Sequence, residues 1–269
     1  MLEAWLALLF GLLIGSFLNV CIYRMPRDLS VVRPRSYCPA CEHPIAWYDN
    51  LPLLSYVLLR ARCRHCNAAI SARYPVVELL TGVLFFVYFW RLGPGLAAVK
   101  FCIYGASLVG LIFTDWEERI LPDEFTLGGT AVGLIFAWFV PVRDDFAQGL
   151  LWLAGVHWNE RWTSVAEAAV GAGVPSLFLW LGGWLYLKLR HREGLGLGDV
   201  KLIAMVGAFL GLRGALLTVI VGSLLGSVIG YAYIRITHKD PSSYELPYGT
   251  FLGIAAIAVS LAGSGMLGW

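Results

Sequence analysis

Long apolar runs constrain the fold of this chain more than any other feature of its sequence. A helix needs about 20 apolar residues to cross the roughly 30 Å hydrocarbon core of a membrane. Hydrophobic residues make up 58% of the chain, and its mean hydropathy of +0.70 is well above the values usual for soluble domains. We therefore expect an all-α polytopic membrane protein with about eight transmembrane helices. The apolar runs cover residues 3–23, 75–92, 96–114, 125–141, 166–187, 200–212, 214–234 and 247–267.

The run at 200–212 is the least regular, because Gly207 and Gly211 interrupt it and Arg213 closes it. We expect it to pack with the following run as a broken pair. The basic residues set the orientation, since 15 of the 20 Lys and Arg residues fall in the loops that follow odd-numbered runs. Those loops are expected to be cytoplasmic, with both termini outside.

The first run begins with Glu3 instead of a basic residue, and its arginines follow the run. We interpret it as an uncleaved anchor and not as a signal peptide. The net charge of +2 gives no indication of a nucleic-acid partner.

The polar segment 24–74 carries two CxxC pairs, "CPAC" and "CRHC". Four thiolates from two tight turns form a closed tetrahedral zinc site of the structural kind. Two disulfides are the alternative, but a cytoplasmic loop lies in a reducing compartment. So short a segment has little core of its own, and zinc binding would supply much of its folding energy. The predicted ligands are Cys38, Cys41, Cys63 and Cys66. His43 and His65 lie beside them and could replace a ligand or be solvated.

Two carboxylates lie at the ends of apolar runs, where charged residues indicate function. Asp115 ends the third run in "GLIFTDWEERILPDEFT", and Asp199 precedes the sixth in "GLGLGDVKL". If they face each other, the pair is expected to share a proton. One ionised and one protonated carboxyl can activate a water and donate to a scissile carbonyl, as in an aspartic protease.

The glycines beside Asp199 admit two interpretations. Gly196 and Gly198 could permit backbone conformations that are closed to other residues and let an extended peptide approach Asp199. They could also form only a Gly-rich turn with Asp199 as a helix cap. Asp123 competes with Asp115 for the catalytic role, but it follows Pro122 and a helix cap explains it adequately.

Four motifs, in this order along the chain, resemble the type IV prepilin peptidase family (leader peptidase/N-methyltransferase). They are "GSFLNVCIYRMPR" (15–27), "RSYCPACEHPIAWYDNLPLLSYVLLRARCRHCNAAISARYPVVE" (35–78), "TDWEERILPDEFT" (114–126) and "GLGLGDVKL" (194–202). Together with the apolar runs the resemblance covers nearly the whole chain. It implies that Asp115 and Asp199 are the catalytic pair of a GxGD-type aspartic protease in the bacterial inner membrane.

The resemblance also implies the substrates. The family cleaves short basic leaders from prepilins and type II secretion pseudopilins at the cytoplasmic face, after a glycine. Bifunctional members then methylate the new N-terminal amine, often of Phe, with S-adenosylmethionine, and the tetracysteine insert is similar to theirs. Glu42, Asp49 and Glu78 could meet the positive charge of the leader or the ammonium and sulfonium groups, or simply pair with nearby arginines.

This comparison divides the chain into a first transmembrane helix (1–23), a cytoplasmic zinc-binding domain (24–74) and a transmembrane peptidase core (75–269). One departure is the loop at about 142–165, which is longer than is usual in the family. Its tryptophans predict an amphipathic piece at the outer membrane interface. They are Trp152, Trp158 and Trp162.

Other functions stay open on the residues alone. The protein could be a peptidase without methyl transfer, or a transporter or metal sensor regulated by the zinc site, with Asp199 and Lys201 lining an ion path. A transporter predicts polar residues at mid-membrane, and the apolar runs contain few. The third alternative is a structural subunit of a secretion complex, which would tolerate the loss of either aspartate.

Overall fold

The computed structural model describes residues 1–156, 158–192, 194–237 and 246–266. These residues form helices, turns and two isolated β-bridges. Among the residues described there is no β-strand beyond these bridges. The chain divides into two compact units, Met1–Gly110 and Leu111–Trp269. Lys239, which contributed to the charge count, and the end of the last apolar run lie outside the described residues.

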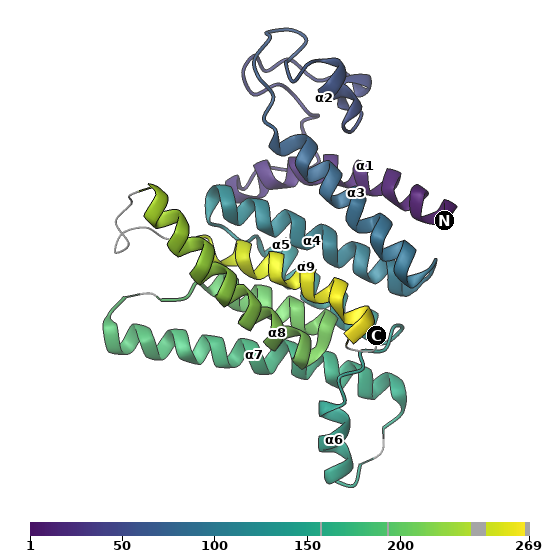
Figure 1. Ribbon diagram of the computed structural model, residues 1–269, viewed down its shortest axis with the longest axis vertical. Helices are drawn as coiled ribbons and strands as arrows, with labels where there is room; N and C mark the ends of the chain where they lie inside the picture. The colour runs from purple at the N-terminus through teal and green to yellow at the C-terminus, as the bar shows by residue number, and fades with distance from the viewer. Residues whose placement is uncertain (157, 193, 238–245, 267–269) are drawn as a thin grey trace. The chain divides into compact units, whose positions relative to one another are not determined.

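In the first unit, α1 (Leu2–Arg24) and α3 (Arg73–Leu92) pack side by side (Figure 1). Small residues allow the two backbones to approach: a Cβ built on Gly11 would lie 2.8 Å from the Cα of Gly82. This kind of contact is typical of membrane helices, which associate through close packing. Asn19 adds a cross-link, since its Nδ2 donates to the carbonyl oxygen of Tyr74 over 3.1 Å.

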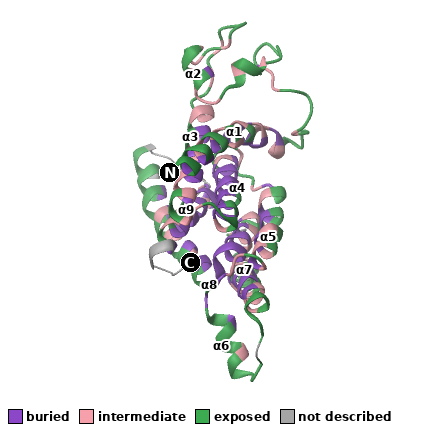
Figure 2. Cartoon of the chain, turned by 90° about the vertical axis from the view of Figure 1, so that its right-hand side faces the viewer, coloured by how far each residue is buried: buried purple, intermediate pink, exposed green. Residues whose placement is uncertain are grey.

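The polar insert connects α1 to α3. It contains the short helices η1 (Met25–Arg27), η2 (Trp47–Asn50) and α2 (Leu54–Leu58), and its residues are mostly exposed or half-buried (Figure 2). The insert therefore has too few buried apolar side chains to resemble an ordinary domain core, as its composition predicted.

The second unit begins within α4 (Leu96–Glu118), which starts in the first unit. Its other helices are α5 (Asp123–Ala137), α6 (Phe146–Leu153), α7 (Glu160–Arg190), α8 (Leu197–Thr237) and α9 (Tyr248–Met266). Helices α7 and α8 pack so closely that a Cβ built on Gly207 would overlap the backbone of Gly171. Helix α8 also packs against α5 and α9.

Helix α8 contains the expected break between the sixth and seventh runs. Gly211 has φ 76°, which is outside the helical region and suits a residue without a Cβ. The Asp144 side chain is fully buried beside it and accepts a hydrogen bond from the N–H of Arg213 over 2.9 Å. This carboxylate acts as a cap for the second half of α8, because it satisfies a backbone donor that the break leaves without its helical partner.

Within the described residues, five helices are long and apolar enough to cross a membrane. Helix α5 has 15 residues, and the apolar part of α9 is Tyr248–Gly263, so both fall short of that length. Eight crossings therefore remain a prediction. The five helical ranges are Leu2–Arg27, Arg73–Leu92, Leu96–Glu118, Glu160–Arg190 and Leu197–Tyr233.

The unusually long loop contains α6 and the start of α7. Trp152, Trp158 and Trp162 are all more than half exposed, as an amphipathic segment requires. Trp162 belongs to α7, which begins six residues earlier than its apolar run, and its ring meets that of Trp138 edge-on at 5.0 Å. Placement of this segment at a membrane interface remains a prediction.

Candidate active site and metal centre

The two predicted catalytic aspartates both lie in the second unit. Asp115 is in the last turn of α4, and Asp199 is in the first turn of α8. Both are buried, with 6% and 9% of their surface exposed, and Asp199 lies close enough to Asp115 to feel its charge. The fold therefore brings together two carboxyls that are 84 residues apart in the sequence.

The first turn of α9 holds the Asp115 carboxyl. The backbone N–H and the Oγ1 hydroxyl of Thr250 donate to Asp115 Oδ2 over 2.6 and 2.8 Å. The same hydroxyl could instead donate to the carbonyl oxygen of Ile112, over a longer distance of 3.2 Å. Asp115 thus satisfies a backbone donor of the α9 N-terminus, which has no partner within its own helix.

Sequence reasoning missed this contribution from α9. Gly249 lies against the same carboxyl, since a Cβ built on it would be 3.1 Å from Asp115 Cγ. Tyr248 interacts electrostatically with Asp199, and its hydroxyl is 2.8 Å from Ser223 Oγ. The available signal was the sequence Pro247–Tyr248–Gly249 at the start of the last apolar run.

Asp123, the rival of Asp115, is engaged elsewhere. It lies in the first turn of α5 with Pro122 as the N-cap, so it is not itself the cap. Its carboxylate accepts from Lys201 Nζ over 2.7 and 3.0 Å. This ion pair connects the start of α5 to the first turns of α8.

The glycines of the "GLGLGD" segment have a steric role, and the expectation of special backbone conformations is wrong for two of them. Neither Gly196 nor Gly198 has a positive φ. A Cβ on Gly198 would be 3.1 Å from Leu121, and one on Gly196 would be 3.4 Å from Asp199 Oδ2. Gly198 is therefore needed chiefly for space, because a side chain there would press against Leu121.

The four cysteines of the insert form one cluster. Their Sγ atoms all lie within 4.8 Å of one another, and Cys38 and Cys66 are 3.8 Å apart at sulfur. All four are free thiols, so the disulfide alternative does not hold in this structure. Zinc–sulfur bonds of about 2.3 Å in a tetrahedron place sulfurs roughly 3.8 Å apart, so this cluster could hold zinc.

Two similar turns present the sulfurs. The N–H of Glu42 donates to the carbonyl of Cys38 over 2.8 Å, and the N–H of Asn67 donates to Cys63 over 3.0 Å. Glu42 and Asn67 both have positive φ, near 56° and 55°. The two CxxC pairs therefore fold alike.

The backbone of the second turn favours a thiolate. N–H groups of Cys66 and His65 point at the Cys63 sulfur and lower the pKa of this thiol to about 7. His65 stacks on His43 with ring centroids 3.6 Å apart, and the metal-binding cluster contains neither ring. The structure thus favours four sulfur ligands over a histidine replacement.

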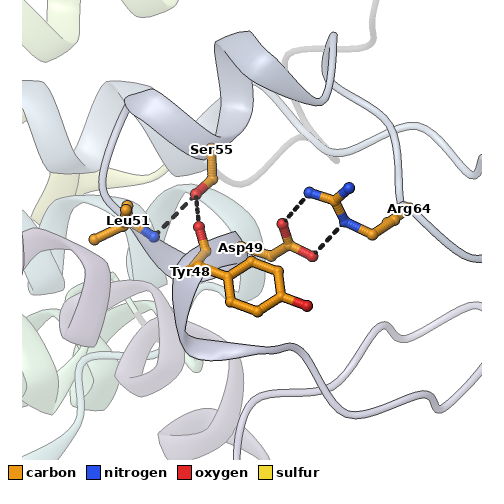
Figure 3. A network of polar contacts seen from close by, with 5 residues as sticks. All are labelled: Tyr48, Asp49, Leu51, Ser55 and Arg64. Atoms are coloured by element: carbon orange, nitrogen blue, oxygen red, sulfur yellow. Dashed lines mark hydrogen bonds and ion pairs between the residues drawn. The ribbon is translucent and has the colours of Figure 1, made fainter.

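An ion pair joins η2 to the second cysteine turn (Figure 3). Arg64 donates to both carboxylate oxygens of Asp49, over 2.8 and 2.6 Å, and lowers the pKa of that carboxyl. Ser55 Oγ donates to the carbonyl of Tyr48 and accepts from the N–H of Leu51. Asp49 is therefore paired with a nearby arginine, one of the roles that the sequence allowed for it.

Glu78 is buried near the start of α3. Its Oε2 accepts from the N–H of Leu53 over 2.8 Å, and Ser16 also hydrogen-bonds to it. Leu53 has a positive φ of 59°, which a leucine rarely adopts. Glu78 thus tethers the insert to the helix pair, whereas Glu42 is exposed.

Comparison with known proteins identifies relatives over most of the chain. The bacterial peptidase A24 N-terminal domain matches residues 9–92, and the type IV leader peptidase family matches residues 102–231. A prepilin leader peptidase/N-methyltransferase of Myxococcus xanthus is 41% identical over 229 residues, which are 85% of this chain and 62% of that relative. No solved structure matched the chain.

Two further relatives carry the same name. That of Aeromonas salmonicida is 35% identical over 98% of this chain and 92% of its own length. That of Neisseria gonorrhoeae is 36% identical over 83% of this chain and 79% of its own length. The identity and coverage of these relatives, with the two matched domains, show that the chain belongs to the type IV leader peptidase family, a family of proteases.

Proposed function

We propose that this protein cleaves the leader peptides of type IV prepilins and type II secretion pseudopilins with Asp115 and Asp199, and then methylates the new N-terminus. The observation that carries the proposal is the buried pair of carboxyls at the ends of α4 and α8. The names of the relatives, prepilin leader peptidase/N-methyltransferase, support both reactions.

In the proposed cleavage one carboxyl is ionised and the other protonated. The ionised carboxyl removes a proton from a water that attacks the scissile carbonyl, and the protonated carboxyl donates to the carbonyl oxygen. The C–N bond then breaks as the carbonyl re-forms and returns its proton, and the leaving amine takes the proton that came from the water. Thr250 occupies Oδ2 of Asp115, which leaves Oδ1 of Asp115 and the Asp199 carboxyl for the reacting groups. Cleavage follows a glycine in this proposal.

We assign the metal site to zinc and to the domain formed by residues 24–74. Cys38, Cys41, Cys63 and Cys66 would hold the ion, which supplies folding energy to a segment with little core. Residues 1–23 form the first transmembrane helix in this division, and residues 75–269 form the peptidase core.

S-adenosylmethionine supplies an electrophilic methyl group when bound. A cavity in the first unit is lined by the rings of Tyr23, Tyr37 and Tyr74 and by the buried side chain of Arg24, so it offers stacking surface to the adenine ring and a cation to the carboxylate of this donor. Asn19 also lines it, and its buried Oδ1 has no hydrogen-bond partner among the described residues. These five residues would hold the donor.

Binding of labelled S-adenosylmethionine to the purified protein tests this assignment without relying on activity. Tyr23→Ala is expected to weaken binding about fivefold while leader cleavage continues, since a lost aromatic stacking contact contributes about 1 kcal/mol. Unchanged binding by Tyr23→Ala would assign the methyl donor to another part of the chain.

The proposed location is the bacterial inner membrane, with several passes through the bilayer. The distribution of Lys and Arg supports a cytoplasmic position for the insert and for the ends of α4 and α8 that carry the aspartates. A prepilin has a basic leader followed by an apolar helix in the bilayer, so its scissile bond would lie at this face.

The overall activity is tested by incubating a prepilin with membranes that contain the protein and measuring the intact mass of the product. Loss of the leader establishes the peptidase, and a further increment of one methylene group at the new N-terminus establishes methyl transfer. An unprocessed prepilin would favour the transporter or the structural subunit. A cleaved but unmethylated product would favour a peptidase without methyl transfer.

A further inference from the structure

Leu121 occupies a position beside both aspartates. It lies in the extended segment between α4 and α5, and it is half-buried. A Cβ on Gly198 would be 3.1 Å from its Cβ and Cδ1, and a Cβ on Gly249 would be 2.9 Å from its Cδ1. The Leu121 side chain therefore fills the space between a glycine next to Asp199 and a glycine that lies against Asp115.

The backbone that carries Leu121 is firmly held. A residue before proline is confined to extended conformations, and Pro122 follows Leu121 directly. The carbonyl of Pro122 accepts from the N–H groups of Phe125 and Thr126 over 3.2 and 3.1 Å. The ion pair of Asp123 with Lys201 then connects this segment to α8, two residues beyond Asp199.

This arrangement limits what can approach the carboxyls. A peptide bond that is cut must come within hydrogen-bonding distance of the catalytic groups. A substrate residue next to a scissile bond that reaches both carboxyls comes against the Leu121 side chain, and a closely packed site accommodates an added methyl poorly. A residue without a side chain avoids this collision.

We propose that Leu121 is a specificity-determining residue, which restricts the residue on the leader side of the scissile bond to glycine. This inference rests on the proposed leader cleavage and names the side chain that selects the substrate. Leu121 acts through contact with the substrate and takes no part in proton transfer.

The test compares two prepilins that differ only in a Gly or an Ala before the scissile bond. Initial cleavage rates are measured in membranes with the wild type, Leu121→Ala, Leu121→Val and the control Ile120→Ala. Ile120 is the neighbouring aliphatic residue and is exposed, so its truncation removes similar atoms from outside the space between Gly198 and Gly249.

The wild type is expected to cleave the Gly substrate about 10- to 200-fold faster than the Ala substrate, the range that one methyl group commonly gives. Leu121→Ala removes the side chain beyond Cβ and is expected to lower this ratio about tenfold or more. Leu121→Val should give an intermediate ratio, and Ile120→Ala should retain that of the wild type.

A ratio that Leu121→Ala leaves unchanged would overturn the inference, as would a wild type without preference. A Leu121→Ala protein that is present at normal abundance but cleaves neither substrate would also overturn it, because Leu121 would then support the aspartates and not select the substrate. A wild type that fails to cleave the Gly substrate would contradict the proposed function instead.

Discussion

The Asp115 carboxyl is held in place by the first turn of α9. Two donors of Thr250 converge on Oδ2, and Gly249 allows the turn to approach because it has no side chain. Such contacts fix a catalytic carboxyl in one orientation before substrate binds. In the proposed mechanism Thr250 is thus a positioning residue, since it would act on the reaction through Asp115.

Replacing Thr250 tests this role. Thr250→Val removes the hydroxyl and keeps the shape, so we expect kcat/KM for leader cleavage to fall roughly fivefold, because a lost hydrogen bond costs about 1 kcal/mol. Thr250→Ser retains the donor and should restore most of the activity. Equal rates for the Val, Ser and wild-type proteins would show that the backbone N–H alone positions Asp115.

The residues of the site were predictable where their chemistry stands out locally. Asp115 and Asp199 adjoin apolar runs, and the CxxC pairs have a spacing that suggests zinc. Thr250 and Leu121 carry no such local sign, because their importance depends on packing between segments that are distant in the sequence. The contact of Thr250 with Asp115, for example, joins residues 135 positions apart.

At the scale of elements, glycines set how closely α7 and α8 pack. A Cβ on Gly171 would be 2.6 Å from the carbonyl oxygen of Gly207 and 2.7 Å from the Cα of Gly211. Gly211 also forms the break in α8 that Asp144 caps. The same glycine therefore permits both the close contact with α7 and the break in α8.

Gly171→Ala is therefore expected to lower stability by about 1–3 kcal/mol, because the added methyl must displace backbone atoms. Gly173→Ala on the same helix is the control, since a Cβ there meets nothing within 4 Å. Thermal unfolding in detergent measures both variants. Similar midpoints for the two would contradict this close crossing.

The cysteine cluster makes a separate prediction for the insert. The purified protein should contain about one zinc per chain, and Cys38→Ala or Cys66→Ala should lose it. Without the metal the insert should become sensitive to proteases, because zinc binding supplies folding energy that its small core does not. Cys102→Ala lies in α4 outside the cluster and should retain zinc. Metal analysis that finds no zinc in the wild type would remove the structural role assigned here.

Every apolar run corresponds to a helix or part of one, but the boundaries differ for identifiable reasons. The run at 125–141 extends beyond α5, which ends at Ala137. Pro141 has no N–H to bond the carbonyl of Ala137 four residues earlier, and this carbonyl accepts from Ser164 Oγ instead, a restriction that a hydropathy average does not register. Helix α7 starts early because the Asn159 side chain caps it, accepting from the N–H of Trp162, and its first turn is charged.

At the scale of the whole molecule, the two compact units carry different parts of the proposed function. The cysteine cluster and the cavity assigned to the methyl donor lie in the first unit. Both aspartates, with Leu121 and Thr250, lie in the second. Apolar runs and motifs predicted a helical protein with a cysteine cluster, but not a boundary between units within α4. The number of membrane crossings remains a prediction, because it depends on how the helices lie in a bilayer.

The most direct measurement of the central claim is prepilin cleavage in membranes that contain Asp115→Asn, Asp199→Asn or Asp123→Asn. Loss of either catalytic carboxyl is expected to lower the rate about 100-fold or more. Asp123→Asn should stay active, because it breaks an exposed ion pair with Lys201 that contributes at most about 1 kcal/mol. Cleavage at the wild-type rate by both Asp115→Asn and Asp199→Asn would contradict the aspartate dyad.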